Sequence, residues 1–183
     1  DYSNVHLCHL GLNEISAAAQ CYPIFLLKDN QTGRFEPIAL FGLSVDENIY
    51  QQANLWHKCY QPLKLASQPL FLTNNSAGEP ELAINISDQR VQKTQGEALF
   101  TNGTATGYLR QQTNMLTELT QGFVLSDIFI KALSDNELIE PVELDITFDN
   151  GEQRQLDGLY TINKEMLPKV SAATQQQFEK NGY

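Results

Sequence analysis

Hydrophobic and polar residues alternate most regularly near the end of the chain, over Pro141–Phe148. Alternation over this length is typical of a strand with one buried and one solvent-facing side. Residues Glu152–Ile162 predict the partner strand of an antiparallel hairpin.

The length of the hairpin loop can be predicted, because each length pairs different residues across the two strands. A two-residue turn would place polar residues opposite apolar ones on the same face. We therefore predict a three-residue loop, Asp149–Gly151, with Gly151 in the left-handed conformation. This loop pairs Leu144 with Leu156, and Val142 with Gly158.

Hydrophobic residues at helical spacing predict a long helix over Tyr108–Leu133. Gln112 and Ser126 interrupt the apolar stripe, so a coiled coil is not predicted. Gly122 lies in the middle and costs up to about 1 kcal/mol relative to alanine. It indicates a kink, a break or a close contact. The stripe contains Leu109, Leu116, Leu119, Phe123, Ile130 and Leu133.

The first half of the chain predicts two more hairpins. The strands Tyr22–Leu27 and Phe35–Leu43 flank the polar link Lys28–Gly33, and their continuous apolar runs indicate strands covered on both faces. Shorter strands are predicted at Leu70–Thr73 and Leu82–Ser87, joined by a turn-rich segment.

Short helices complete the pattern. We predict a short helix over Leu12–Cys21, which ends before Pro23, and a second short helix over Lys164–Leu167. Ser171–Lys180 predicts a third, with Ser171 as N-cap and a stop at Gly182. The fold class is therefore α+β, a mainly antiparallel sheet of about six strands built from hairpins, with the long helix and the shorter helices packed on it.

Composition and charge narrow the function. The 183 residues suit a single domain, and 42% hydrophobic with 19% charged residues is ordinary for a soluble globular protein. The net charge of −10 and the scattered basic residues argue against nucleic acid as a partner. No apolar run is long enough for membrane insertion.

Three cysteines occur, at Cys8, Cys21 and Cys59. An odd and sparse count argues against a disulfide framework and indicates a reducing compartment. We therefore expect a cytoplasmic location.

A scattered but ordered set of positions covers nearly the whole chain. It includes Tyr22-Pro23, Thr32–Pro37, Ala39–Leu43, Glu47-Asn48, Trp56, Tyr60–Pro62, Pro69–Phe71, Gly96–Phe100, Gly107–Leu109, Leu138–Pro141, Gly151, Leu156–Tyr160 and Lys164–Leu167. In this order they resemble the SapC family of bacterial proteins, named after a surface-layer locus. The resemblance implies an association with surface-protein export loci and supplies no catalytic residues. It also implies that the domain continues past Tyr183. With Asp1 in place of Met, we expect a chain trimmed at both ends.

Eight residues in and after the first hairpin are candidates for a binding surface, because Trp, Tyr and Arg often dominate binding energy. The alternative interpretation, which we favour, is structural. In that case Asp29 caps the turn, Arg34 bridges to Glu47, and Trp56 fills the core. The candidate surface comprises Tyr22, Lys28, Asp29, Arg34, Glu47, Asn48, Trp56 and Tyr60.

Two His-x-Cys segments offer a possible metal site of His6, Cys8, His57 and Cys59. Zinc prefers such nitrogen and sulfur ligands, but the spacing is unlike the usual Cys-x2–4-Cys pairs. Nucleophile elbows and phosphate-binding loops are missing from the sequence. We therefore expect no cofactor.

The sequence thus favours a non-catalytic accessory domain that binds a protein or peptide, in surface-protein export or modification. One alternative is a metal-dependent enzyme or metal-stabilised module at the four His and Cys residues. Another is a structural subunit of the surface layer. The sequence leaves the oligomeric state open.

Overall fold

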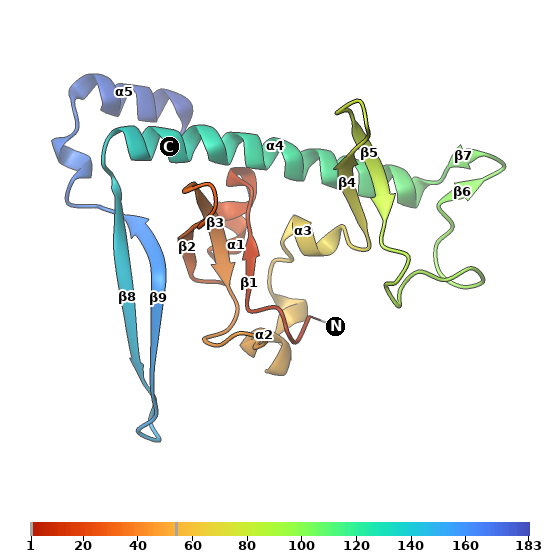
Figure 1. Ribbon diagram of the computed structural model, residues 1–183, viewed down its shortest axis with the longest axis horizontal. Helices are drawn as coiled ribbons and strands as arrows, with labels where there is room; N and C mark the ends of the chain where they lie inside the picture. Colours follow the sequence, from red (N-terminus) through yellow and green to blue (C-terminus); the bar gives the residue numbers. More distant parts are fainter. Residues whose placement is uncertain (1, 54) are drawn as a thin grey trace.

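One long helix, α4, organises the molecule (Figure 1). The structure is a computed structural model that describes residues 2–53 and 55–183. Helix α4 covers Gly107–Asp135, which is about 43 Å at 1.5 Å per residue. It begins where the Thr106 side chain accepts a hydrogen bond from the Leu109 N–H. The predicted long helix is confirmed.

The main sheet has five antiparallel strands, in agreement with the about six predicted, in the order β1-β3-β2-β9-β8. Strands β2 and β3 form the first predicted hairpin, and β8 and β9 form the last. The additional strand β1 was not predicted, because three residues are too few to show a period. The strands are β1 Leu7–His9, β2 Ile24–Lys28, β3 Phe35–Leu40, β8 Ile139–Thr147 and β9 Gln153–Ile162.

Two small hairpins stand apart from this sheet. Strands β4 (Leu70–Asn74) and β5 (Pro80–Ile84) pair beside the first half of α4, as Figure 1 shows. Strands β6 (Phe100–Thr101) and β7 (Thr104–Ala105) form a turn just before α4 begins. The hairpin predicted around residues 70–87 is therefore present, but outside the main sheet.

The loop of the β8–β9 hairpin has three residues, as predicted. The Phe148 N–H donates to the Glu152 carbonyl at 2.8 Å, and Gly151 has φ +83°. Leu144 lies opposite Leu156, as expected, but Val142 lies opposite Leu159 rather than Gly158. The expected Val142–Gly158 pair is wrong because β9 bulges by one residue, with Gly158 at φ +77°.

The short helices support the sheet and α4. The segment predicted as one helix over 12–21 forms η1 (Leu12–Glu14) followed by α1 (Ile15–Ala18). Helix α5 (Ala172–Asn181) starts at the Ser171 cap and ends at Gly182, as predicted. The remaining helices are α2 Ile49–Gln52, η2 Trp56–Lys58, α3 Leu63–Ala66 and η3 Leu167–Lys169. In the described part of the chain, no helix has the length and apolarity needed to cross a bilayer.

Gly122 marks a close contact with the loop before η1. A Cβ atom placed on Gly122 would lie 2.9 Å from Gly11 Cα, closer than real Cβ contacts allow. The Asn13 amide donates to the Glu118 carbonyl of α4 at 3.1 Å across the same contact. The absent side chain therefore lets the two backbones meet.

The buried side chains form three clusters. One lies between β1, β3 and the 50–65 segment and contains Tyr22, Phe41 and Trp56. A second joins the C-terminal half of α4 to β2 and α5, around Leu133. The third joins the N-terminal half of α4 to the β4–β5 hairpin, around Leu116.

Candidate functional site

Two of the eight predicted surface residues belong to the first cluster, and a third, Asn48, is also buried. Tyr22 and Trp56 are only 3% and 8% exposed, and the Trp56 ring meets Phe41 with 5.2 Å between centroids. Asn48 is fully buried, accepts hydrogen bonds from the Tyr50 and Gln51 N–H groups, and starts α2. These three side chains are therefore part of the protein interior and not of a binding surface.

Three others lie at the tip of the β2–β3 hairpin. The Asp29 carboxylate accepts hydrogen bonds from the Gln31 N–H and from the Thr32 N–H and hydroxyl. Those from Thr32 are the main reason why the pKa of Asp29 is lowered. The Lys28 ammonium lies over the Phe35 ring. The capping role that the structural interpretation gave to Asp29 is present.

Glu47 pairs with a different arginine from the one expected. Its carboxylate lies 3.3 Å from the Arg154 guanidinium, which comes from β9. Arg34 does not bridge to Glu47, so that part of the structural interpretation is wrong. The partner is 107 residues away along the chain, and no local pattern indicates it.

The last of the eight, Tyr60, leads to a buried network that sequence reasoning missed. Its hydroxyl donates to the carboxylate of Glu14 at 3.0 Å. The same carboxylate accepts from the Gly11 and Leu63 N–H groups at 3.0 and 2.9 Å. Glu14 is 2% exposed, so this carboxylate ties η1 to the start of α3 from within the core. The eight residues therefore divide between the core, a hairpin tip and separate polar links.

The alternative metal site is not formed. Cys8 is buried, and its burial raises the pKa of the thiol to about 12, which disfavours the thiolate that binds metals. Residues 2–53 and 55–183 contain no group of three His, Cys, Asp or Glu side chains that could hold a metal ion. His6, Cys8, His57 and Cys59 are thus not a ligand set.

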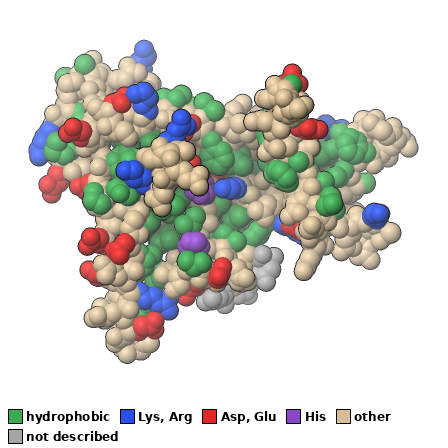
Figure 2. Space-filling model, viewed as in Figure 1, with side chains coloured by type: hydrophobic (Ala, Val, Ile, Leu, Met, Phe, Trp, Pro, Cys, Tyr) green, Lys and Arg blue, Asp and Glu red, His purple; other side chains and the backbone are tan. Residues whose placement is uncertain are grey.

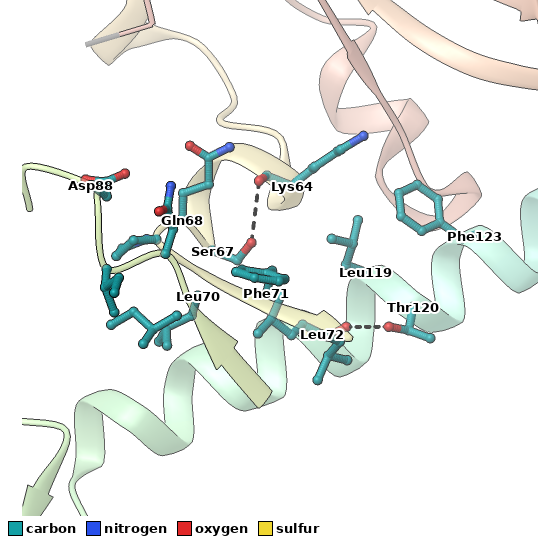
Figure 3. A pocket seen from close by; sticks show the side chains of 15 residues that line it. Lys64, Ser67, Gln68, Leu70, Phe71, Leu72, Asp88, Leu119, Thr120 and Phe123 are labelled. Atoms are coloured by element: carbon teal, nitrogen blue, oxygen red, sulfur yellow. Dashed lines mark hydrogen bonds between the residues drawn. The ribbon is translucent and has the colours of Figure 1, made fainter. Parts of the chain in front are cut away.

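A hollow of about 730 Å³ opens between the β4–β5 hairpin, α3 and α4 (Figure 3). Its α4 wall is formed by Leu116, Leu119 and Phe123, and its β4 wall includes Phe71 and Leu72. Phe71 remains 45% exposed and Ile86, on the far rim, 80% exposed. The hollow therefore leaves a substantial apolar surface open to solvent.

Two further hollows continue this one along α4. The second, of about 300 Å³, shares Lys64 and Phe123 with the first. The third, of about 540 Å³, shares Arg34 and Asp127 with the second and reaches Ser134. We call the three together the α4 groove. Between Leu116 and Ser134 it follows the helix for about 27 Å.

Charged side chains line the middle and the far end of the α4 groove, where Arg34 and Asp127 border the second and third hollows and Lys131 borders the third. In Figure 3, Lys64 extends from α3 towards Phe123. His9 pairs with Glu36 at 2.6 Å in the second hollow, and its pKa is lowered mainly by burial and also by Lys64. Figure 2 shows apolar side chains gathered below α4, with basic and His side chains among them.

Three hydroxyl groups in the α4 groove are already engaged in hydrogen bonds to backbone carbonyls. Ser67 donates to the Lys64 carbonyl and Thr120 to the Leu116 carbonyl, as the dashed lines of Figure 3 mark. Ser126 donates to the Gly122 carbonyl. These three arrangements pair no hydroxyl with a general base, and the first hollow of the α4 groove is suited to binding apolar groups.

Of the α4 groove, sequence reasoning identified only Arg34 as a candidate binding residue, and it assigned the apolar wall to the core. Leu116, Leu119 and Phe123 belong to the predicted apolar stripe, and Phe71 to a predicted strand. The length of the apolar stripe could have indicated the groove. The stripe is longer than the surface that one short hairpin can cover, so part of it must remain open.

Comparison with known proteins gives one match. The SapC family profile matches residues 2–183, essentially the whole chain. No curated protein and no solved structure matches.

Proposed function

Because the chain belongs to the SapC family, we propose that it is a non-catalytic accessory domain that binds a protein or peptide in surface-protein export or modification. The observation that carries the proposal is the α4 groove, whose first hollow is open and mainly apolar. A location in the cytoplasm belongs to the same proposal and rests on the odd, sparse cysteine count.

The shape of the α4 groove favours a polypeptide segment over a compact ligand. A length of about 27 Å corresponds to about five helical turns, and grooves of this kind bind amphipathic helices through apolar residues on one face. The ligand's apolar side chains would enter the hollow beside Phe71 and Phe123. Exposed aromatic side chains at the centre of such a site supply much of the binding energy.

Lys64 indicates where the bound segment carries a negative charge. It lines both the first and the second hollow, and in residues 2–53 and 55–183 it has no ion-pair partner. Asp88, at the far side of the first hollow, is held by Arg90 at 2.6 Å. The segment that fits carries apolar residues towards Phe71, an acidic residue next to Lys64, and a neutral or basic residue where it passes Asp127.

The test is site-specific crosslinking in the native cells. A photoreactive amino acid replaces Phe71 in one version of the full-length protein. The matched control replaces Asn114, which is exposed on the opposite side of α4. We expect a defined polypeptide adduct from position 71 and none from position 114.

A charge variant completes the test. Lys64→Glu should weaken the adduct at position 71, whereas Lys180→Glu, an equal charge change far along the chain in α5, should leave it intact. Identical adducts from positions 71 and 114, or no polypeptide adduct at 71, would overturn the proposal. A small molecule that copurifies in the hollow would do the same.

A further inference from the structure

The β8–β9 hairpin ends the main sheet with an unpaired strand. Strand β8 lies at the edge of the five-stranded order, and β9 is its only hydrogen-bonded strand in the described part of the chain. β9 in turn pairs with β2 only at Leu159 and Tyr160. The remainder of the hairpin projects from the body as a two-stranded ribbon, as Figure 1 shows.

The backbone of β8 offers hydrogen-bonding groups along this edge. The Phe148 N–H points to β9, where it donates to Glu152. In an antiparallel pair, alternate residues face the partner, so Glu143, Asp145 and Thr147 direct their N–H and C=O groups outward. Pro141 also faces outward and has no N–H to donate. The free pairing segment is therefore residues 143–147.

The solvent-facing side of this ribbon is acidic. Glu143 and Asp145 are exposed on β8, and Asp157 is exposed beside them on β9. No ion pair involves these three carboxylates among the described residues. Figure 2 shows Asp and Glu side chains gathered along the outer side of the hairpin. The opposite face carries the half-buried Val142, Leu144 and Ile146.

These charges decide which strand can pair with β8. In a second copy aligned antiparallel about Leu144, Glu143 would lie opposite Asp145, and like charges in that position are destabilising. A register centred on Asp145 would set two copies of Asp145 against each other. Charge at an edge prevents such self-association, but it favours a strand of opposite charge.

We propose that the outer edge of β8 is a second docking site, which adds an extended basic segment of another protein to the sheet. Lysine or arginine side chains of that segment lie beside Glu143 and Asp145. Small apolar residues between them extend the face formed by Val142, Leu144 and Ile146. Pairing of backbone groups provides affinity and the alternate side chains provide specificity. The site is independent of the α4 groove.

The probe is a short capped peptide of alternating lysine and valine, titrated into the isotope-labelled protein and followed by amide chemical shifts. We expect the largest shifts at Glu143, Asp145 and Thr147. A peptide with glutamate in place of lysine should not bind. A lysine–valine peptide with N-methyl groups on alternate residues should bind at least about tenfold more weakly, since it keeps the charge and loses the edge hydrogen bonds.

Two matched double charge reversals test whether the probe binds at the β8 edge or is attracted by the overall negative charge of the protein. Glu143→Lys/Asp145→Lys should weaken the probe at least about tenfold. Glu79→Lys/Glu81→Lys, which alters the exposed β4–β5 hairpin by the same charge, should change it little. Unchanged binding of the N-methylated peptide would overturn the proposal, because the attraction would then be purely electrostatic. So would shifts centred away from β8, or no shift at millimolar peptide. None of these results would affect crosslinking from Phe71 in the α4 groove.

Discussion

A methyl group added at Gly122 should destabilise the protein, although alanine is the better helix former. The backbone of Gly11 would lie 2.9 Å from the new Cβ, and the side chain of Asn13 occupies the same space. The loop before η1 and helix α4 must then separate, or the loop must rearrange. Gly11 contributes backbone atoms, and the Asn13 amide is held in place by its hydrogen bond to the Glu118 carbonyl.

The expected size follows from two opposing contributions. Replacing a mid-helix glycine by alanine gains up to about 1 kcal/mol. Forcing a methyl group into a packed contact costs about 1–3 kcal/mol, and backbone neighbours place this site at the upper end. We expect a net loss of about 2 kcal/mol in the free energy of unfolding. For a chain of this length, that lowers Tm by about 4–8 °C.

Urea unfolding followed by circular dichroism measures this difference, with Gly107→Ala as the control. Gly107 lies in the first turn of the same helix, and a Cβ there meets nothing within 4 Å. We expect the control to be as stable as the original chain or slightly more stable. If Gly122→Ala matched or exceeded the stability of Gly107→Ala, the close approach of Gly11 to α4 would be refuted.

Four further substitutions test other side chains. Glu14→Gln should lower the unfolding free energy by about 2–4 kcal/mol, because an amide cannot accept all the hydrogen bonds that the buried carboxylate accepts, whereas Tyr60→Phe should cost about 1 kcal/mol. Equal effects in urea unfolding would contradict the network. Gln112→Leu should stabilise by about 1 kcal/mol, since the buried Gln112 Oε1 has no hydrogen-bond partner among the described residues; a loss of stability in the same assay would contradict this. The pKa of His9 is lowered in the folded state, chiefly by burial, so its contribution to stability is present above the unfolded-state pKa of about 6.5 and is lost as the pH falls below that value through the lower folded-state pKa. His9→Asn should flatten the measured pH dependence there, and an unchanged slope would exclude His9 as its source.

The elements predicted correctly are those whose signal is local. The β8–β9 loop follows from alternation within a single hairpin, and the ends of α5 follow from Ser171 and Gly182. The α4 stripe is visible because the helix is long. Strand β1 has no such signal: its three residues become a strand only because β3 lies beside them.

The candidate surface shows the same limit. A sequence identifies Trp56 as a large aromatic, but burial depends on the Phe41 and Tyr22 rings that the fold brings against it. The role of Asp29 could be predicted because its partners are two and three residues away. The partner of Glu47 could not, because Arg154 reaches it from another strand. The α4 groove likewise exists only where separate elements leave part of one helix uncovered.

The two halves of α4 pack in two different hydrophobic clusters, so each half can unfold locally as a separate unit. Leu109, Leu116 and Leu119 pack with the β4–β5 hairpin, whereas Ile130 and Leu133 pack with β2 and α5. Local unfolding of one unit can therefore occur while the other stays folded. A ligand in the first hollow would slow amide hydrogen exchange in the N-terminal half of α4 and leave the C-terminal half at its own rate. The helix is one continuous element, but the free energy of local unfolding differs between its two halves.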